Sequence, residues 1–326
     1  MEGNQTERLA AGAHRHMRLV RIPFVFVFMG IKNAITIDVE DWFQVSLFRN
    51  HVRREEWDKM PSTVVKNTCR ILDLFAKKNV KATFFILGWI AERFPEIVLA
   101  IKDFGHEIAS HGYGHQIIYE LSREEFFRDV QKSLHLLESI TGDPVRGYRA
   151  PSYSITRSSM WAWEALAQLG ITVDSSIFPV KHDLYGIPDA PRFPFEIRLA
   201  SGPRLIEFPL STIKLMGKNI PMAGGGYLRL YPYWFIRNSV RRINAEGKPA
   251  IIYLHPWEVD PELPRLKLGK FKTMRHYGNL ALTTERLSRL LDEFAFGTMH
   301  EVLATTSVQK DWPRTEEASN NNGKFH

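Results

Sequence analysis

The stretch ITIDVEDWFQ, residues 35–44, joins a short apolar run to a cluster of three carboxylates. The run alternates apolar and polar residues, which is the pattern of a β-strand. Side chains two positions apart on a strand share a face, so Asp38 and Glu40 are expected to face one site while Asp41 points the other way. Solvated acids or helix caps at a strand end are the alternative.

Strand-like and helix-like segments alternate along most of the 326 residues, which predicts an α/β fold built on a parallel sheet or barrel. Strands are predicted at residues 34–38, 80–88, 107–110, 171–176 and 250–255. Helices are predicted at residues 62–78, 156–169, 232–245 and 284–296, at a segment begun by Pro95, and from Ser122, which forms a capping box with Glu125. Residues 178–226 are rich in Pro and Gly and are expected to form a loop-rich insertion with short hairpins.

No linker or internal repeat divides the chain, so residues 29–306 are expected to form one domain, with about 259–306 as its C-terminal extension. Residues 1–28 are a doubtful N-terminal extension, because Met29 offers a second start directly before the first strand. The apolar run 22–31 is too short for a membrane span, which needs roughly 20 residues, and a signal-peptide core is the alternative. We therefore expect a cytoplasmic protein rather than a secreted or periplasmic one, without an integral membrane span, whose polar residues 307–326 are disordered.

Composition narrows the choice of partners and sites. Cys69 is the single cysteine, so a metal would need His and carboxylate ligands. The net charge of +7 could suggest nucleic acid, but Lys and Arg are scattered and no nucleic-acid motif occurs, so no such partner is expected. With 44% hydrophobic residues the chain can bury a large core.

The segment ASHGYGH places His111 and His115 four positions apart, directly after a predicted strand. This spacing suits a helical turn that would bring both imidazoles to a single ion, although such pairs also occur by chance. A carboxylate from the first strand would complete the site. Two His and one carboxylate, with positions left open for water, are typical of a catalytic metal site rather than a structural one.

Three further polar residues follow or end predicted strands. Arg149 could hold a carboxylate in a bidentate pair, His255 could act as a general acid, and Asp174 could hydrogen-bond a catalytic His. An ordinary surface ion pair for Arg149 and a core position for His255 are the alternatives. Together with Asp38 and His111, these residues lie at the carboxyl ends of strands, where the active sites of α/β barrels gather.

In this order, the segments TIDVED, SHGYGH, RAPSY, VDSSIFP and YLHPWE resemble the motifs of the polysaccharide deacetylases of the NodB-homology type, carbohydrate esterase family 4, over residues 36–258. The segments AGGGYLRLYP, LHPWEVDPELP and RHYGNLALTTERL are similar to phrases of the subgroup associated with exopolysaccharide gene clusters and exosortase A systems. The resemblance implies a distorted (β/α) barrel of about seven strands and a divalent metal, most often Zn²⁺. It also implies removal of N-acetyl groups from N-acetylhexosamine units of a carbohydrate polymer or its lipid-linked precursor.

Carried over by position, the resemblance makes Asp38 the general base that deprotonates a metal-bound water, and Arg149 the residue that holds it. It makes His255 the acid that protonates the leaving amine, and Asp174 the residue that orients His255. The implied metal ligands are Glu40, His111 and His115. A backbone N–H near Ser152 or Tyr153 would bind the oxyanion. The sugar groove is expected to involve the loop 224–227 and the aromatic residues Trp42, Tyr153 and Trp257, for which packing at the barrel rim is the alternative.

The first motif departs from the commonest family pattern of two adjacent Asp residues, because Val39 follows Asp38. A minority branch with an Asp-x-Asp spacing maps the metal ligand onto Glu40, in agreement with strand parity, and leaves Asp41 as a bystander or a cap. That branch also includes hydrolases of non-sugar amides or cyclic C–N bonds, which is one alternative function. A catalytically silent glycan-binding relative is another. No oligomeric state is predicted.

Overall fold

The structure is a computed structural model that describes residues 30–199 and 204–312. From Ile31 onward the described residues belong to one compact unit. The expectations for residues 1–28 and for the end of the tail fall outside the described residues. None of the helices in the described ranges is long and apolar enough to cross a membrane.

The main sheet is mostly parallel and has the order β10-β1-β2-β3-β4-β5-β7-β6-β12, with β11 paired to β1. The strands are β1 Asn33–Val39, β2 Thr83–Ile86, β3 Glu107–Ser110, β4 Gly147–Tyr148, β5 Val173–Asp174, β6 Phe195–Arg198, β7 Arg204–Glu207, β10 Ile251–Leu254, β11 Phe296–Gly297 and β12 Gln309–Trp312. The seven strands from β10 to β7 run parallel to their neighbours, whereas β6 is antiparallel to β7. A separate hairpin consists of β8 Thr212–Leu215 and β9 Lys218–Pro221.

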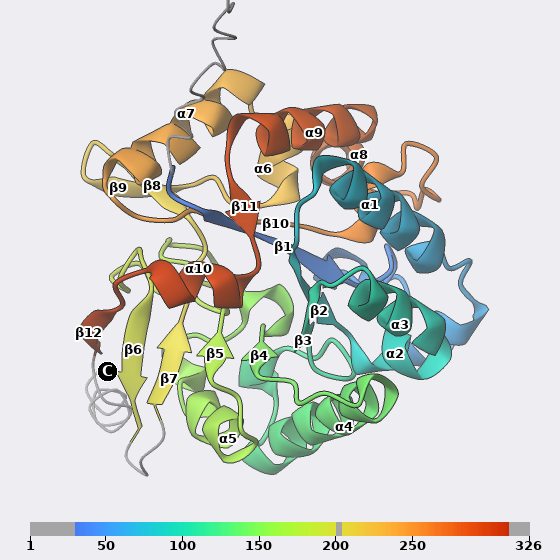
Figure 1. Ribbon diagram of the computed structural model, residues 1–326. Coiled ribbons are helices and arrows are strands. Elements are labelled where there is room, and N and C mark those ends of the chain that lie inside the picture. Colours follow the sequence, from blue (N-terminus) through green and yellow to red (C-terminus); the bar gives the residue numbers. More distant parts are fainter. Residues whose placement is uncertain (1–29, 200–203, 313–326) are drawn as a thin grey trace, which may run out of the picture. The chain divides into compact units, whose positions relative to one another are not determined.

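The helices are α1 Val64–Lys78, α2 Gly88–Arg93, α3 Pro95–Asp103, α4 Arg123–Thr141, α5 Ala162–Gln168, α6 Gly225–Leu230, α7 Tyr233–Ala245, α8 Lys270–Tyr277, α9 Thr283–Glu293 and α10 Met299–Thr305. Most of them lie around the outer side of the curved sheet (Figure 1). The exception is α10, whose Met299 and Val302 belong to the same buried cluster as Ala34 of β1 and Phe85 of β2. The α4 helix begins as predicted, because the Ser122 side chain accepts from the Glu125 backbone N–H and the Glu125 carboxylate accepts from the Ser122 N–H.

The α/β class is confirmed, and the described strands form an open path rather than a ladder that closes on itself. The segment after β7 spans the gap to β10 through single hydrogen bonds. The N–H of Leu210 donates to the carbonyl of Ile177 at 2.9 Å, and Ser211 Oγ accepts from the Ile251 N–H at 2.8 Å. The expected distorted barrel is therefore not seen as a closed ladder among the described strands.

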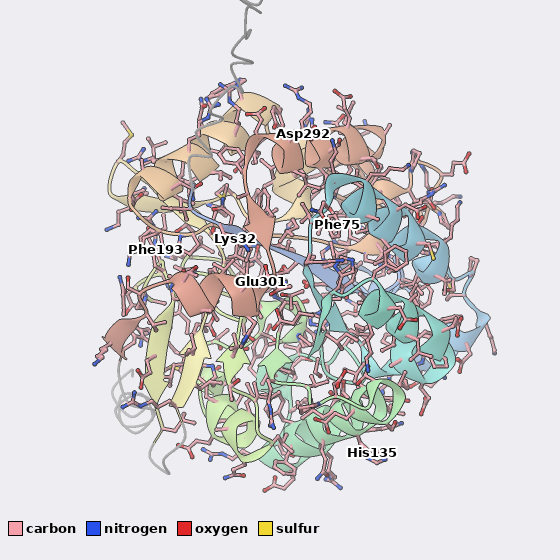
Figure 2. The ribbon with its side chains drawn as sticks, viewed as in Figure 1. Lys32, Phe75, His135, Phe193, Asp292 and Glu301 are labelled. Carbon is pink, nitrogen blue, oxygen red and sulfur yellow. The ribbon has the colours of Figure 1, made fainter. Side chains whose placement is uncertain are left out.

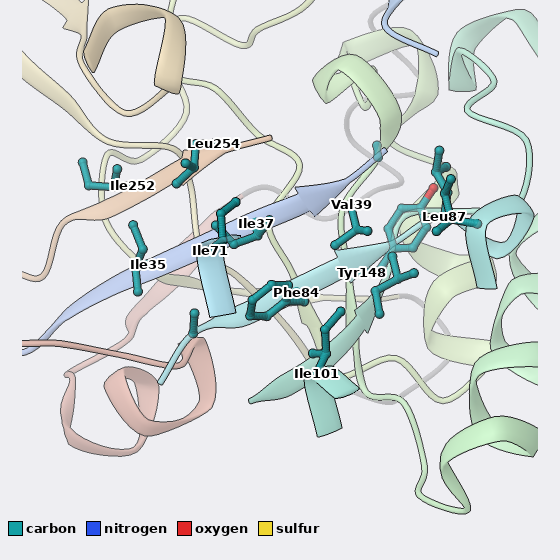
Figure 3. Close-up of a cluster of buried hydrophobic side chains, with 14 of the residues drawn as sticks. Ile35, Ile37, Val39, Ile71, Phe84, Leu87, Ile101, Tyr148, Ile252 and Leu254 are labelled. Atoms are coloured by element: carbon teal, nitrogen blue, oxygen red, sulfur yellow. The ribbon is translucent and has the colours of Figure 1, made fainter. Parts of the chain in front are cut away.

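The two faces of β1 have different neighbours. Ile35, Ile37 and Val39 point outward and pack with α1, α3 and the neighbouring strands in the main apolar cluster (Figure 3). Ala34 belongs to the second cluster, on the inner face, together with Phe85 of β2. By strand alternation, Asp38 therefore ends the inner row.

The C-terminal extension packs directly against the start of β1. Strand β11 pairs with Asn33 and Ala34, and Lys32 forms an ion pair with Glu301 of α10 at 3.3 Å, with both side chains close together in Figure 2. The extension is therefore part of the same unit as the barrel.

Several local expectations were wrong. The tail does not become disordered at residue 307, because Gln309–Trp312 form β12 against β6. The insertion 178–226 contains the expected hairpins, but one of them, β6–β7, joins the main sheet. The helix expected at 156–169 begins only at Ala162, after a 3₁₀ turn, and α2, α6, α8 and α10 were missed. These helices are short, at eight residues or fewer, which leaves little room for a periodic signal.

Candidate active site

The carboxyl ends of the parallel strands meet at one edge of the sheet. Register places Asp38 beside Phe85, Ser110 beside Tyr148, and Tyr148 beside Asp174. The residues that follow these strand ends therefore converge, which is why segments far apart in sequence share one site.

Asp38 is held by Arg149. Nη1 of Arg149 donates to Asp38 Oδ1 at 2.6 Å and to Thr36 Oγ1 at 2.8 Å, while Nε donates to the Ser175 carbonyl at 3.0 Å. The guanidinium also lies over the Phe85 ring, 4.0 Å from its centroid. Both members of the ion pair are almost fully buried, so the guanidinium fixes the position of one carboxylate oxygen.

The second oxygen of Asp38 faces the site. Tyr153 OH donates to Asp38 Oδ2 at 3.3 Å, and His255 Nε2 lies 4.0 Å from the same oxygen. Of the three aromatic residues expected at the sugar groove, Tyr153 is therefore the one that reaches the Asp38 carboxylate.

Glu40, His111 and His115 form a compact set of possible metal ligands, with one ligand atom from each within 4.8 Å of the others. The His pair does not lie on a helical turn as expected. Gly112 (φ +72°) and His115 (φ +50°) adopt left-handed conformations in an irregular loop. Asp129 of α4 holds that loop, because it accepts from the backbone N–H of Tyr113 at 2.7 Å and of Gly114 at 3.1 Å.

The donor chemistry of the three side chains fits a divalent cation. His111 Nδ1 is engaged with the Arg149 carbonyl at 2.8 Å, which leaves Nε2 free as a ligand. Burial lowers the pKa of His111 to about 4, so its imidazole is neutral. His115 Nε2 lies 2.7 Å from Glu40 Oε2, yet that oxygen has no hydrogen-bond partner in the described part of the chain. Nε2 of His115 and Oε2 of Glu40 are thus close enough for one ion to bind both.

The charge of Glu40 is favoured by its neighbours. Burial acts to raise its pKa, but the interaction with His115, with a smaller contribution from His255, outweighs it and lowers the pKa to about 2. A buried carboxylate that stays ionised suits a cation ligand.

Asp41 faces away from the site, as strand parity predicts. Its carboxylate accepts from Ser62 Oγ at 2.5 Å and from the backbone N–H of Thr63 and Val64, at the start of α1. Asp41 thus satisfies free N–H groups at the N-terminus of α1 and does not reach the two His residues.

His255 has a partner other than the one expected. Its Nδ1 lies 3.1 Å from Oε2 of Glu258, which belongs to the 3₁₀ turn Pro256–Val259 that follows His255. Oε1 of Glu258 accepts from Arg229 Nε at 2.9 Å. Burial acts to lower the pKa of His255, but Glu258, followed by Glu40 and Asp38, outweighs it and raises the pKa to about 9.

The assignment of Asp174 as the partner of His255 is therefore wrong. Asp174 accepts from Trp163 Nε1 at 2.9 Å and from Ser176 Oγ at 2.5 Å, whereas Nδ1 of His255 lies 3.1 Å from Glu258 Oε2. Sequence reasoning missed Glu258 because the motif pattern assigned the role to Asp174. Glu258 follows His255 by three positions, a spacing that can bring two side chains together on a helical turn and could have indicated this partner.

Replacement of Glu258 by Gln is expected to lower kcat about 10- to 100-fold, because the carboxylate that orients the His255 ring is lost. Metal content should stay unchanged, since Glu258 contacts none of the three possible ligands. Acetate release and metal analysis measure both effects. Glu262→Gln, an exposed acid on the same segment, is the matched control. An unchanged kcat in Glu258→Gln would contradict this role.

Asp174 instead pairs with a second buried acid, Glu207 of β7. Both are fully buried, and register places them side by side. Burial and the nearby Asp174 hold the pKa of Glu207 well above its usual range, so the pair carries a shared proton. Glu207 Oε1 accepts from the Ile177 N–H at 2.9 Å, and Ser176 Oγ accepts from the Ala150 N–H at 2.8 Å. The pair thus shapes the turn that also holds Arg149.

Stability at alkaline pH should depend on Glu207. A group whose pKa is raised in the folded state stabilises the fold below its unfolded pKa, and this contribution is lost as the pH rises through the folded value. The free energy of unfolding should therefore fall with pH, at a slope of up to about 1.4 kcal/mol per pH unit, and Glu207→Gln should flatten that slope. Urea unfolding between neutral and alkaline pH measures it. Equal slopes in both proteins would refute the shared proton.

Two of the three expected groove aromatics are packed inside. Trp42 is buried against Phe43 and Phe48, with ring centroids 5.6 and 5.9 Å away, and its Nε1 donates to the Pro61 carbonyl. Trp257 is buried in a stack between His255 and His276. The packing alternative therefore holds for both residues.

The glycine loop also has a packing role. A Cβ on Gly225 would lie 2.0 Å from Glu258 Oε2, and one on Gly224 would lie 2.5 Å from the Tyr253 ring. The loop approaches Glu258 closely, and any larger residue at 225 would displace the partner of His255.

The turn Pro151–Tyr153 lies beside Asp38 in a strained conformation, with Ser152 (φ 53°) and Tyr153 (φ 55°) both left-handed. The Tyr153 N–H donates to the Ala150 carbonyl at 3.0 Å. Of the two backbone groups expected to bind an oxyanion, Tyr153 N–H is therefore already engaged.

A cleft of about 340 Å³ opens beside His115. It is lined by residues of the segment 43–57 and the loop 114–121, including Gln44, Ser46 and Arg54. An extended ligand can thus reach the set of possible metal ligands from this side.

Comparison with known proteins identifies relatives over part of the chain. A peptidoglycan-N-acetylglucosamine deacetylase of Bacillus cereus is 37% identical over 98 residues, which cover 30% of this chain and 36% of that protein. A peptidoglycan deacetylase of Helicobacter pylori is 32% identical over 108 residues, covering 33% and 36%. The chain thus spans about a third of the length of these curated relatives. A crystal structure from Mycobacterium smegmatis described as a polysaccharide deacetylase has a TM-score of 0.58 at 20% identity, covers 87% of this chain and 95% of its own, and shows the same fold.

Two family models match consecutive segments. The model for polysaccharide deacetylase matches residues 56–173, and the model for a domain of unknown function, DUF3473, matches residues 175–304. The boundary between them falls at strand β5, inside the sheet, and the second segment supplies β7, β10 and His255. The chain is therefore similar to polysaccharide deacetylases over residues 56–173, and the segment that matches the domain of unknown function completes its sheet and its candidate site.

Proposed function

We propose that the protein is a metal-dependent hydrolase that removes N-acetyl groups from N-acetylhexosamine units of a polysaccharide or its lipid-linked precursor, in exopolysaccharide biosynthesis. The observation that carries the proposal is one cluster of side chains. Asp38 bound to Arg149, the set of Glu40, His111 and His115, and His255 all lie at one edge of the sheet, with His255 Nε2 3.5 Å from Glu40 and 4.0 Å from Asp38.

Glu40, His111 and His115 would hold the metal, for which we propose Zn²⁺ because it accepts nitrogen and carboxylate ligands. When bound, the ion would polarise the acetamide carbonyl and the attacking water. The three protein ligands would leave coordination positions open, which is typical of catalytic sites.

Asp38 is the proposed general base. Arg149 occupies Oδ1, so Oδ2 is the oxygen that would take the proton of the attacking water. Water adds to the acetamide carbon, the C–N bond then breaks, and His255 Nε2 gives its proton to the leaving amine. The products are acetate and a free amino sugar. Glu258 would keep the His255 proton donor directed toward the site.

The test combines metal analysis with an acetate-release assay on the same sample of purified protein. Oligomers of N-acetylglucosamine are the first substrates, and cyclic ureides are the comparison for a ring C–N hydrolase. We expect about one divalent ion per chain, acetate release from the oligomers, loss of release after chelation and recovery with Zn²⁺. A metal-loaded protein that releases no acetate from any N-acetylated glycan would refute the proposal.

A further inference from the structure

A second cleft, of about 890 Å³, lies between the loop 179–193 and the β8–β9 hairpin. Its volume falls in the range of small-molecule binding sites, about 300–1,000 Å³. It lies almost wholly within the domain of unknown function, and the proposed chemistry does not use it.

The lining of this cleft carries an excess of positive charge. Lys181, Lys214 and Lys218 are exposed, and none of the described carboxylates forms an ion pair with them. Asp189 is the one carboxylate among the described lining residues, and Arg157 neutralises it. Three cations without counterions around one concave surface favour an anionic ligand.

An aromatic stack adjoins these cations. The Tyr185 ring lies between His182, at 3.8 Å and 6° from parallel, and Phe178, at 5.8 Å and 8°. His182 and Tyr185 both line the cleft. Burial and the positive charge of Arg275 lower the pKa of His182, and the negative charge of Asp183 opposes them. A flat ring beside cations suits a ligand that has both an apolar face and an acidic group.

The cleft is connected to the candidate active site through two tyrosines. The Tyr185 ring packs against Tyr153, with centroids 6.0 Å apart, and Tyr153 OH lies 3.3 Å from Asp38 Oδ2. The wall of the cleft therefore packs against the residue that contacts the proposed base.

We propose that this cleft binds the acidic part of a glycan whose N-acetylhexosamine lies at Asp38, with Lys181, Lys214 and Lys218 contacting its anionic oxygens and the exposed His182 ring supporting a sugar ring. The inference rests on the proposed function and names the substrate class, an acidic polysaccharide. The anionic oxygens can belong to uronic acid carboxylates or to phosphodiesters between sugars.

The test measures binding by calorimetry in an Asp38→Asn background, which prevents turnover. The probes are a hexasaccharide that alternates glucuronate with N-acetylglucosamine, a phosphodiester-linked glycan oligomer, and neutral hexa-N-acetylchitohexaose. We compare Lys181→Gln/Lys214→Gln/Lys218→Gln with a control of the same charge change, Lys59→Gln/Lys77→Gln/Lys102→Gln, on other surfaces. Circular dichroism checks that both fold, and vesicles with and without anionic lipid form a further arm.

We expect at least one acidic probe to bind about tenfold more tightly than the neutral one, and more weakly at high salt. The cleft variant should lose this preference and the control should keep it. The stronger acidic probe identifies carboxylate or phosphodiester. Equal binding of acidic and neutral probes, or a preference that survives in the cleft variant, would overturn the proposal. The proposal would also be overturned if the cleft variant lost binding only to vesicles that contain anionic lipid, because the surface would then be a membrane contact. The experiment measures binding and not acetate release, so it tests the cleft even if the protein does not deacetylate these glycans.

Discussion

Asp38→Asn is expected to lower kcat/KM for acetate release about 10²- to 10⁴-fold, because the amide cannot accept a proton from the attacking water. The substitution keeps the shape of the side chain, and its oxygen can still accept from Arg149 Nη1. Metal content should stay that of the unaltered protein, since Asp38 is outside the set of Glu40, His111 and His115. Acetate release over a range of substrate concentrations measures the loss.

The control for this experiment is Asp73→Asn, the same change at an exposed position on α1. It should leave kcat/KM unchanged. If Asp38→Asn retained more than about a tenth of the activity, the general base would have to be another group, since a positioned base contributes at least about 10²-fold.

Substitutions of the neighbouring acids Glu40 and Asp41 are expected to affect different properties, metal binding in one case and stability in the other. Glu40→Gln should remove most of the bound metal and reduce activity to that of chelated protein, because a charged ligand is replaced by a weak neutral one. Asp41→Asn should keep the metal but lower the free energy of unfolding by about 1–2 kcal/mol, because its carboxylate satisfies the N-terminus of α1.

The two variants control for each other, since both replace a buried acid by its amide at adjacent positions. Metal analysis and urea unfolding on both proteins give the result. Retained metal in Glu40→Gln together with lost metal in Asp41→Asn would reverse the assignment and require a rearrangement of the loop after β1.

Strand parity was sufficient to separate these acids from sequence. Because β1 is a regular strand with one face toward α1 and one toward the site, alternation alone puts Asp38 inward, Glu40 on the same side and Asp41 outward. The convergence of His111, Arg149 and His255 was equally predictable, since the ends of parallel strands share one edge.

The features that the sequence did not predict depend on packing between segments whose local sequence has no clear helix or strand pattern. Trp42 and Trp257 are buried by neighbours from other segments, and no local pattern distinguishes a buried aromatic residue from a groove residue. The partner of His255 was missed for a similar reason. Glu258 is brought to the ring by a 3₁₀ turn and held there by Arg229 of α6, a helix too short to be predicted.

The position of β1 in the sheet has a consequence for how the chain is made. The strand that carries Asp38 lies between β2 and β10. The ribosome synthesises β10 much later than β1, since the bond from Thr36 Oγ1 to the Ile252 carbonyl joins residues 216 positions apart. During translation one edge of β1 therefore remains an unpaired template, and contacts of such long sequence separation slow folding. Aggregation of the nascent chain is the hazard at this stage, and truncation within the second family segment should yield insoluble protein rather than a smaller enzyme.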